Sequence, residues 1–563
     1  MFHKWLRRFR KRRSSKAVNP DEIFIDSSNI PAFNKDQFEG RIETPISAGL
    51  LSVLQIIFCL ATLIFVSRAM YLQVISGDFY FVRAERNNLK KELIFAHRGI
   101  IADRNDVPLA WNEESSTTPY DKRVYTDKSG FSNILGFVKY PGVDSSGHLY
   151  SFSTTGQDGI EKYYDAELAG QNGAKLSEVS VTGKIESQSA LEPPQNGDKL
   201  NLSIDSRVQE VFHRELSDAA EKSDFKGAAG VIMDINTGEV IASVSYPGFD
   251  SNIMTGGNDQ ATISDYLGSK RQPFLDRPTA GLYAPGSIVK PYLAAGVLAE
   301  RIINPDKQIF TVGYLTLPNP YDKEHPTIFK DWKDQGYVDL RKAIAVSSDV
   351  YFYIVGGGFG DQKGLGISKI DEYMHKFLFG TPTDGFLAGP SGTVPTPDWK
   401  KATFDGEDWR IGDTYHTAIG QYGFQVTPLQ IVRAMSGIAS DGTIVSPTII
   451  KGDQGQQTNI DGVDKSYYQI IKEGMRMAVT EQTAIALNIP DVKVAAKTGT
   501  AQIGVGNSRV NSWVEGFFPY DNPRYAFAVV MENGPTTYAV SSMRAMSSTL
   551  SWMAANTPEY VGN

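Results

Sequence analysis

Three short groups of polar residues, far apart in the chain, contain the residue types needed for acyl transfer through a serine. The first group is Ser287-Ile-Val-Lys290. A serine hydroxyl is a weak nucleophile until a base takes its proton, and a lysine serves as that base only when desolvation or a neighbouring cation lowers its pKa. Ala284-Pro-Gly precedes the group and a helical apolar run follows it, so we expect Ser287 at a helix N-terminus with Lys290 on the same face. Taken alone, a serine cap followed by a solvated lysine explains the pattern equally well.

The second group is Ser347-Ser-Asp349, which lies between apolar residues. This setting predicts polar groups presented from an otherwise buried loop. Ser347 could relay a proton to a leaving group, and Asp349 could orient Lys290. Taken alone, the group is better explained as a helix N-cap.

The third group is Lys497-Thr-Gly-Thr500. On a strand, Lys497 and Gly499 face one way, whereas Thr498 and Thr500 face the other. Glycine lets another chain approach the strand closely, so a substrate could add there as an extra strand. Lys497 would supply positive charge for a substrate carboxylate or for tuning the first lysine. Taken alone, this group is a common surface tripeptide.

In this order and at this spacing, the three groups resemble the signature of penicillin-binding proteins and class A β-lactamases. The wider resemblance is to the class B penicillin-binding proteins, the monofunctional transpeptidases of bacterial cell-wall synthesis. Asp349, where the general signature has Asn, and Gly412-Asp-Thr414 favour the elongation, or rod-shape, type over the division type. Other segments that carry the resemblance are 98–105, 159–164, 233–239, 245–250, 419–423 and 426–430.

The resemblance implies a mechanism and a set of site residues. Ser287 would attack the carbonyl of the penultimate D-Ala of a peptidoglycan stem peptide and release the terminal D-Ala, and an amine of a neighbouring stem would capture the acyl group. Backbone N–H groups of Ser287 and Thr500 would form the oxyanion hole. β-Lactams would acylate Ser287, and no metal or organic cofactor is implied. The implied catalytic residues are Ser287, Lys290, Ser347, Asp349 and Lys497, and the implied substrate-binding residues are Thr498, Gly499 and Thr500.

Two other classes of protein fit part of the pattern. A β-lactamase or D,D-carboxypeptidase shares the acylation chemistry but must activate water, and no additional Glu for that task is evident in the sequence. A β-lactam sensor needs a cytoplasmic signalling domain, for which the polar N-terminal tail is too small. An inactive structural subunit is expected to lose Ser287, Lys290 or Lys497, all of which are present.

Composition limits the class of protein further. The 563 residues predict two or three domains, and the net charge of -8 argues against a nucleic-acid-binding protein. Cys59 is the single cysteine, which excludes an internal disulfide and a multi-cysteine zinc site. We expect Cys59 to be a small buried hydrophobe.

An uncharged apolar stretch from Ile46 to Ser67 is long enough to cross a hydrocarbon core of about 30 Å. It is longer than a usual signal-peptide core, and a buried helix of a soluble domain is the other alternative. The basic cluster between Lys4 and Lys16 predicts a cytoplasmic N-terminus. The catalytic part would then lie outside the cytoplasm of a bacterial cell, attached to the membrane by a single span.

The pattern along the chain predicts a cytoplasmic tail (1–45), a transmembrane helix (46–68), a small β-rich non-catalytic pedestal (69–195) and a transpeptidase domain (196–563). In the last domain we expect a helix after Asp205, a hairpin within 230–244, strands at 493–500, 513–518 and 525–532, and a helix at 541–555. Residues 284–450 read as mostly helical. This order indicates an α+β fold, with an antiparallel sheet flanked by helices and a helical subdomain.

The pedestal is shorter than the resemblance leads one to expect. Only a short segment separates Asn112 from Gly156, where elongation-type relatives usually insert a larger head. That head commonly contacts a polytopic glycan polymerase of the SEDS type and elongation scaffold proteins. Its reduction puts those contacts in doubt and leaves the catalytic residues untouched.

Overall fold

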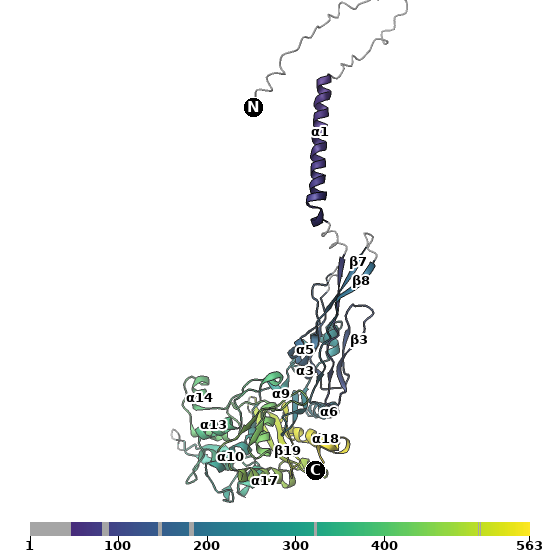
Figure 1. Ribbon diagram of the computed structural model, residues 1–563. Coiled ribbons are helices and arrows are strands. Elements are labelled where there is room, and N and C mark those ends of the chain that lie inside the picture. Colours follow the sequence, from purple (N-terminus) through teal and green to yellow (C-terminus); the bar gives the residue numbers. More distant parts are fainter. Residues whose placement is uncertain are drawn as a thin grey trace, which may run out of the picture. The chain divides into compact units, whose positions relative to one another are not determined.

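The structure is a computed structural model that describes residues 47–80, 89–142, 144, 149–179, 185–319, 322, 324–504, 506 and 508–562. The predicted cytoplasmic tail, with its basic cluster, lies outside the described residues. The chain divides into two compact units, residues 1–89 and residues 90–563, and each is considered by itself (Figure 1).

The first unit contains the predicted membrane span. Helix α1 (Ala48–Met70) continues into a π-helical turn, η5 (Tyr71–Ile75). Within the described residues, 48–75 is the one helix long and apolar enough to cross a membrane, and its mean hydropathy is 2.5. The expectation that Cys59 is buried is wrong, because α1 buries no residue against protein and the thiol is exposed on its surface.

The second unit begins with the β-rich pedestal. One of its sheets has the order β4-β3-β2-β9, in which β9 pairs parallel to β2, and another has the order β1-β7-β8. The strands and helices are β1 (Leu89–Ile94), β2 (Ile101–Ala102), β3 (Pro108–Glu113), β4 (Lys122–Tyr125), α3 (Ser132–Leu135), β5 (Val138–Lys139), β6 (Thr155–Gly156), α4 (Gly159–Tyr163), α5 (Asp165–Ala169), β7 (Gly173–Val179), β8 (Ile185–Glu192) and β9 (Leu200–Asn201).

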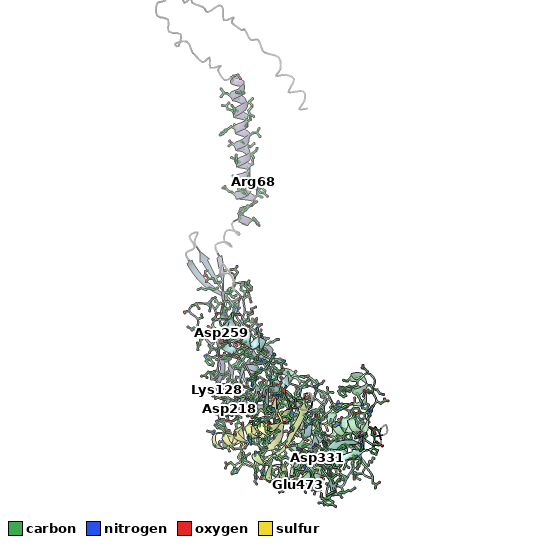
Figure 2. All side chains as sticks on the ribbon, turned by 180° about the vertical axis from the view of Figure 1, so that it is seen from behind. Arg68, Lys128, Asp218, Asp259, Asp331 and Glu473 are labelled. Carbon is green, nitrogen blue, oxygen red and sulfur yellow. The ribbon has the colours of Figure 1, made fainter. Side chains whose placement is uncertain are left out.

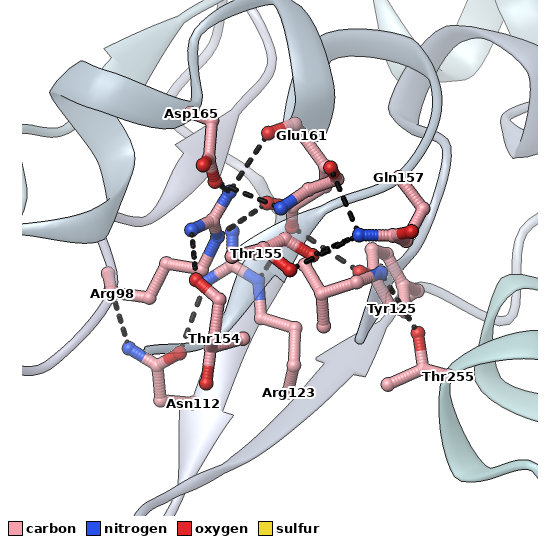
Figure 3. Close-up of polar contacts among 12 residues, drawn as sticks. Arg98, Asn112, Arg123, Tyr125, Thr154, Thr155, Gln157, Glu161, Asp165 and Thr255 are labelled. Carbon is pink, nitrogen blue, oxygen red and sulfur yellow. Dashed lines mark hydrogen bonds and ion pairs between the residues drawn. The ribbon is translucent and has the colours of Figure 1, made fainter. Parts of the chain in front are cut away.

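A buried charge network ties the pedestal together (Figure 3). Glu161 is fully buried and accepts hydrogen bonds from Nε of Arg98 at 2.6 Å and from Nε of Arg123 at 2.7 Å. Arg98 also donates to Asp165 at 2.7 Å and to the carbonyl of Thr154 at 3.1 Å. These bonds join Arg98, in the segment before β2, to β4, α4 and α5, so residues of the motifs at 98–105 and 159–164 belong to one network.

The predicted transpeptidase domain is built on an antiparallel sheet which, in the described part of the chain, has five strands in the order β11-β10-β20-β19-β18. Helices α6 and α18 pack on one face, and α10 and α16 pack on the other, so the sheet separates two apolar cores. The predicted hairpin, the three late strands and the final helix are confirmed. The bounds are α6 (Ser206–Lys222), β10 (Gly227–Asp234), β11 (Val240–Tyr246), α10 (Lys290–Ala299), α16 (Pro428–Ala439), β18 (Ala495–Ile503), β19 (Arg509–Phe518), β20 (Tyr525–Pro535) and α18 (Ser541–Asn556).

The helical subdomain lies between β11 and β18 in the sequence. In the described part of the chain, three small two-stranded sheets interrupt it, and the sequence analysis missed them because strands of three or four residues show too little alternation to differ from loops. Its elements are α7 (Ser251–Gly256), α8 (Gln260–Gly268), α9 (Arg277–Ala280), β12 (Ile309–Thr311), β13 (Tyr314–Leu317), β14 (Thr327–Lys330), β15 (Gly336–Val338), α11 (Leu340–Ala345), α12 (Asp349–Gly357), α13 (Ile367–Lys376), α14 (Pro397–Thr403), α15 (Ile411–Ala418), β16 (Thr443–Val445), β17 (Gln457–Asn459) and α17 (Lys465–Glu481).

Polar side chains cap two of the helices that pack on the sheet. Asp205 accepts a hydrogen bond from the backbone N–H of Arg207 and so caps α6, as the sequence predicts. Thr427 and Gln430 form a capping box at α16, the helix that packs under the centre of the sheet.

The Glu161 network gives a stability prediction. Glu161→Gln would leave the buried Arg123 guanidinium without its counter-charge and would leave Arg98 paired with Asp165 alone, so the pedestal should lose about 3–5 kcal/mol of unfolding free energy. Hydrogen–deuterium exchange of β2, β3 and β4 measures this loss. Asp165→Asn is the matched control, and its loss should be smaller because Asp165 is 34% exposed. Equal protection in the wild type and Glu161→Gln would contradict this account.

Candidate active site

Ser287 lies in a tight turn that is pressed against the edge strand of the sheet. The turn is a 3-10 helix, η6 (Gly286–Val289), and α10 starts at Lys290, so the serine precedes the α-helix by one short turn. Gly286 has a φ of 58°, a conformation that favours glycine. A Cβ at Gly499 on β18 would lie 2.9 Å from Ile288, so the glycine of the third group is what lets η6 approach the strand.

Lys290 is completely buried beside this turn. Its Nζ donates to Oδ1 of Asp349 at 2.6 Å and to the carbonyl of Ser347 at 2.9 Å. The Ser347 hydroxyl is a further partner, at 3.4 Å. In this arrangement of the described residues, no hydrogen bond joins Lys290 to Ser287 Oγ. The geometry therefore brings the first and second groups together through Asp349 and Ser347.

Lys497 approaches the same hydroxyl from β18. Its Nζ donates to Ser347 Oγ at 2.8 Å and to the carbonyl of Thr498 at 2.7 Å. Complete burial, with repulsion from Lys290 as a smaller cause, lowers the pKa of Lys497 well below its usual range. Ser347 Oγ thus lies between two lysine side chains, where it can pass a proton from one to the other.

The backbone around Ser347 is held in an unusual conformation. Ser347 has a φ of 58°, which is uncommon for a residue with a side chain and is typical of constrained functional positions. The next residue, Ser348, caps α12 by accepting from the backbone N–H of Tyr351 at 3.2 Å. The N-cap alternative is therefore correct for Ser348, while Ser347 and Asp349 on either side contact Lys290.

Asp331 supports this loop and was missed by the sequence analysis. Its Oδ2 accepts from Ser348 Oγ at 2.8 Å and from the backbone N–H of Val350 at 3.1 Å, and Figure 2 labels it within the catalytic domain. Burial raises the pKa of Asp349, the attraction of Lys290 opposes that rise, and repulsion from Asp331 adds to it.

The exposed edge of β18 completes the arrangement. β18 pairs with β19 on one side, and its other edge carries no strand from the described part of the chain. Thr498 is half-buried and Thr500 is exposed, whereas Lys497 and Gly499 are buried, so the predicted alternation of faces is confirmed. Such an edge offers unpaired N–H and C=O groups to an extended peptide.

Further residues that the sequence analysis missed lie beneath β18. Trp513 on β19 donates from Nε1 to the carbonyl of Ala284 at 2.9 Å and fixes the segment that leads to Ser287. Glu515, on the same strand, is fully buried and accepts from Tyr292 of α10 at 2.6 Å. The sequence signal for Glu515 was a glutamate inside the apolar run from Trp513 to Phe518. Within the described ranges, no three His, Cys, Asp or Glu side chains gather where they could bind a metal.

Comparison with known proteins agrees with this geometry. Residues 228–549 match the penicillin-binding protein transpeptidase domain, and residues 115–202 match the penicillin-binding protein dimerisation domain. The peptidoglycan D,D-transpeptidase MrdA of Haemophilus influenzae is 30% identical over 453 residues, which are 74% of this chain and 67% of that protein. The peptidoglycan D,D-transpeptidase FtsI of Escherichia coli is 23% identical over 545 residues, 84% of this chain and 85% of that protein.

A solved complex between PBP2 and MreC from Helicobacter pylori shares the fold. Its superposition with this chain gives a TM-score of 0.69 at 25% identity and covers 83% of this chain and 99% of that one. The transpeptidase match extends over more than half of the sequence, and the dimerisation match precedes it as in a two-domain, monofunctional protein. The chain therefore belongs to the penicillin-binding proteins, as a class B member with a serine acyl-transferase domain.

Proposed function

We propose that this chain is a peptidoglycan D,D-transpeptidase that cross-links stem peptides through an acyl-enzyme on Ser287 during cell elongation. The observation that carries the proposal is the convergence of Lys290 and Lys497 on the Ser347 hydroxyl, next to η6 and an exposed strand edge. The similarity to MrdA and the lower identity to FtsI support the elongation role.

In the acylation step, the Ser287 oxygen forms a bond to the carbonyl carbon of the penultimate D-Ala. Lys290 takes the hydroxyl proton when its amine is in the neutral form. Backbone N–H groups of Ser287 and Thr500 receive the developing oxyanion, an effect often worth about 3 kcal/mol. The bond to the terminal D-Ala then breaks, and Ser347 passes a proton to the departing amine, because its hydroxyl contacts both lysines.

The second step reverses these proton movements. An amine of a neighbouring stem attacks the ester carbon, its proton passes through Ser347 and Lys290, and the bond to Ser287 breaks as the serine regains its hydrogen. The new amide bond is the cross-link. The persistent ester that a β-lactam forms arises from the same first step, since its ring amide occupies the place of the D-Ala-D-Ala bond.

The substrate carboxylate is assigned to the β18 edge. Lys497 supplies positive charge from below, and the hydroxyls of Thr498 and Thr500 supply hydrogen bonds from the strand. Gly499 leaves room for the turn that carries Ser287. A peptide that adds to β18 would place its last amide beside Ser287.

The proposal also includes the domain boundaries and the location of the protein in the cell. Residues 46–68 would anchor the chain in the bacterial plasma membrane, with 1–45 in the cytoplasm and the pedestal (69–195) and transpeptidase domain (196–563) outside it. The apolar helix supports the anchor, and the basic residues of the N-terminal tail support the orientation. A glycan polymerase of the SEDS type is a proposed partner, because cross-linking consumes stems on newly made glycan strands.

The pedestal offers a surface for a scaffold protein of the MreC kind, by analogy with the Helicobacter pylori complex. A groove of about 800 Å³ lies beside β3, and the segments just before β2 and β9 complete its lining. Ile100, 40% exposed, and Trp111 provide its apolar contacts.

The nucleophile assignment gives the first functional prediction. Ser287→Ala should abolish labelling by a fluorescent penicillin, and mass spectrometry of the wild type should place the adduct on Ser287. Ser217→Ala, a serine on the far face of the sheet, should label normally. Retained labelling of Ser287→Ala would refute the assignment, and rapid release of the adduct from the wild type would favour a hydrolase.

The charged groups predict a narrow pH range for acylation. Asp349 protonates, and loses its pairing with Lys290, as pH falls through its raised pKa. Lys497 loses its charge as pH rises through its lowered pKa. On the acidic side, the acylation rate should therefore fall at a pH above the ordinary carboxyl pKa of about 3.9. On the basic side, it should fall at a pH below the ordinary lysine pKa of about 10.4. Asp349→Asn should shift the acidic limb to lower pH, and an unshifted limb would assign it to another group.

The groove assignment can be measured with the full-length protein in detergent. Ile100→Asp should weaken binding of the MreC homologue from the same cell about tenfold, which equals about 1.4 kcal/mol. Ile328→Asp, at a 54% exposed isoleucine on β14, is the control and should bind normally. Equal affinities of the two variants would show that the partner does not bind at this groove.

A further inference from the structure

Glu515 occupies a position in the catalytic domain that the mechanism above leaves unused. It pairs directly with Lys497 across the β18–β19 ladder, so the two side chains emerge on the same face of the sheet. That face packs against α10, the helix that begins at Lys290. A carboxyl group therefore lies beneath the lysine that is assigned to the substrate carboxylate.

The surroundings of this carboxyl are unusual for a residue with a purely structural role. Glu515 is fully buried, and its Oε2 accepts one hydrogen bond, at 2.6 Å, from the hydroxyl of Tyr292. Its Oε1 is buried and has no hydrogen-bond partner among the described residues. A buried carboxyl with a single neutral partner is costly, and such groups are retained where charge has a task.

The two lysines around Ser347 differ in their direct partners. The Lys290 ammonium has Asp349 as its direct ion-pair partner. The direct partners of Lys497 are a hydroxyl and a carbonyl, which are neutral. Of the groups that act on Lys497, Lys290 disfavours its charge, whereas Glu515 and Asp349 favour it. Since Asp349 is already paired, Glu515 is the carboxyl that remains for Lys497.

We propose that Glu515 is a positioning residue that keeps Lys497 cationic for the substrate carboxylate, and that Tyr292 holds the Glu515 carboxylate in place for this purpose. The proposal deepens the transpeptidase function and rests on it. Glu515 would touch neither substrate nor Ser287. It would act on Lys497 by electrostatic attraction from the neighbouring strand, because charge interactions in a buried site are weakly screened.

The direction of the effect follows from the charges of the groups involved. Burial raises the pKa of Glu515, and the Tyr292 hydrogen bond and Lys497 oppose that rise. At low pH the carboxyl is protonated, so Glu515→Gln should acylate at the wild-type rate. As pH rises the wild-type carboxylate forms and supports the Lys497 charge, whereas the glutamine does not. The basic limb of the variant should therefore lie at lower pH.

The experiment measures the second-order rate of Ser287 acylation by benzylpenicillin between about pH 6 and about pH 9. Glu515→Gln should match the wild type at the acidic end and fall about tenfold below it at the basic end, a shift of about one pH unit. Tyr292→Phe should shift the basic limb in the same direction by less, and it provides the test if Glu515→Gln does not fold. Asp234→Asn, at a buried carboxylate on β10, should leave the profile unchanged.

A second probe separates the charge effect from a general loss of structure. Benzylpenicillin methyl ester lacks the carboxylate that Lys497 would bind, so Glu515→Gln should not alter the pH profile of its acylation rate. Identical benzylpenicillin profiles for wild type, Glu515→Gln and Tyr292→Phe would overturn the inference. So would equal pH shifts with the acid and the ester. Failure of the wild type to be acylated at Ser287 would instead overturn the proposed function.

Discussion

The catalytic domain depends on holding two lysine side chains against one serine hydroxyl, out of contact with water. Lys290 and Lys497 are both fully buried, and both donate to Ser347 Oγ. Two like charges so close repel each other, and burial adds a desolvation cost of several kcal/mol for each ion. The surrounding fold must offset this cost, and the carboxyl groups near the site contribute to that.

The compensation comes from elements that are distant in sequence. Asp349 at the start of α12 pairs with Lys290, and Asp331 accepts a hydrogen bond from Ser348 in the same loop. Glu515 lies beside Lys497 on the neighbouring strand. Each of these carboxyl groups is buried or partly buried, and each costs free energy unless its partner is present. The site is therefore cooperative, because the loss of one charge changes the protonation of the others.

Much of this arrangement was predictable from the sequence, for a physical reason. Short motifs such as Ser287 to Lys290, and Lys497 to Thr500, set their own geometry through one turn of helix or one alternation of a strand. The α+β order, the apolar span and the final helix follow from periodicity in the same way. Contacts set by tertiary packing were not predictable, and Asp331, Glu515 and the Arg98–Glu161 network belong to that class. Their partners depend on strand register and on loop paths that no local pattern encodes.

The open edge of β18 has a consequence for ligands that have no β-lactam ring. A folded protein normally protects an unpaired strand edge, because any extended chain can join it. Here the edge must stay open, with Thr498 and Thr500 as its polar side chains. A compound that copies the donor and acceptor spacing of a β-strand and ends in an anion therefore has a complete docking surface without acylating Ser287. A compound of this kind could therefore bind tightly along the β18 edge without being chemically reactive.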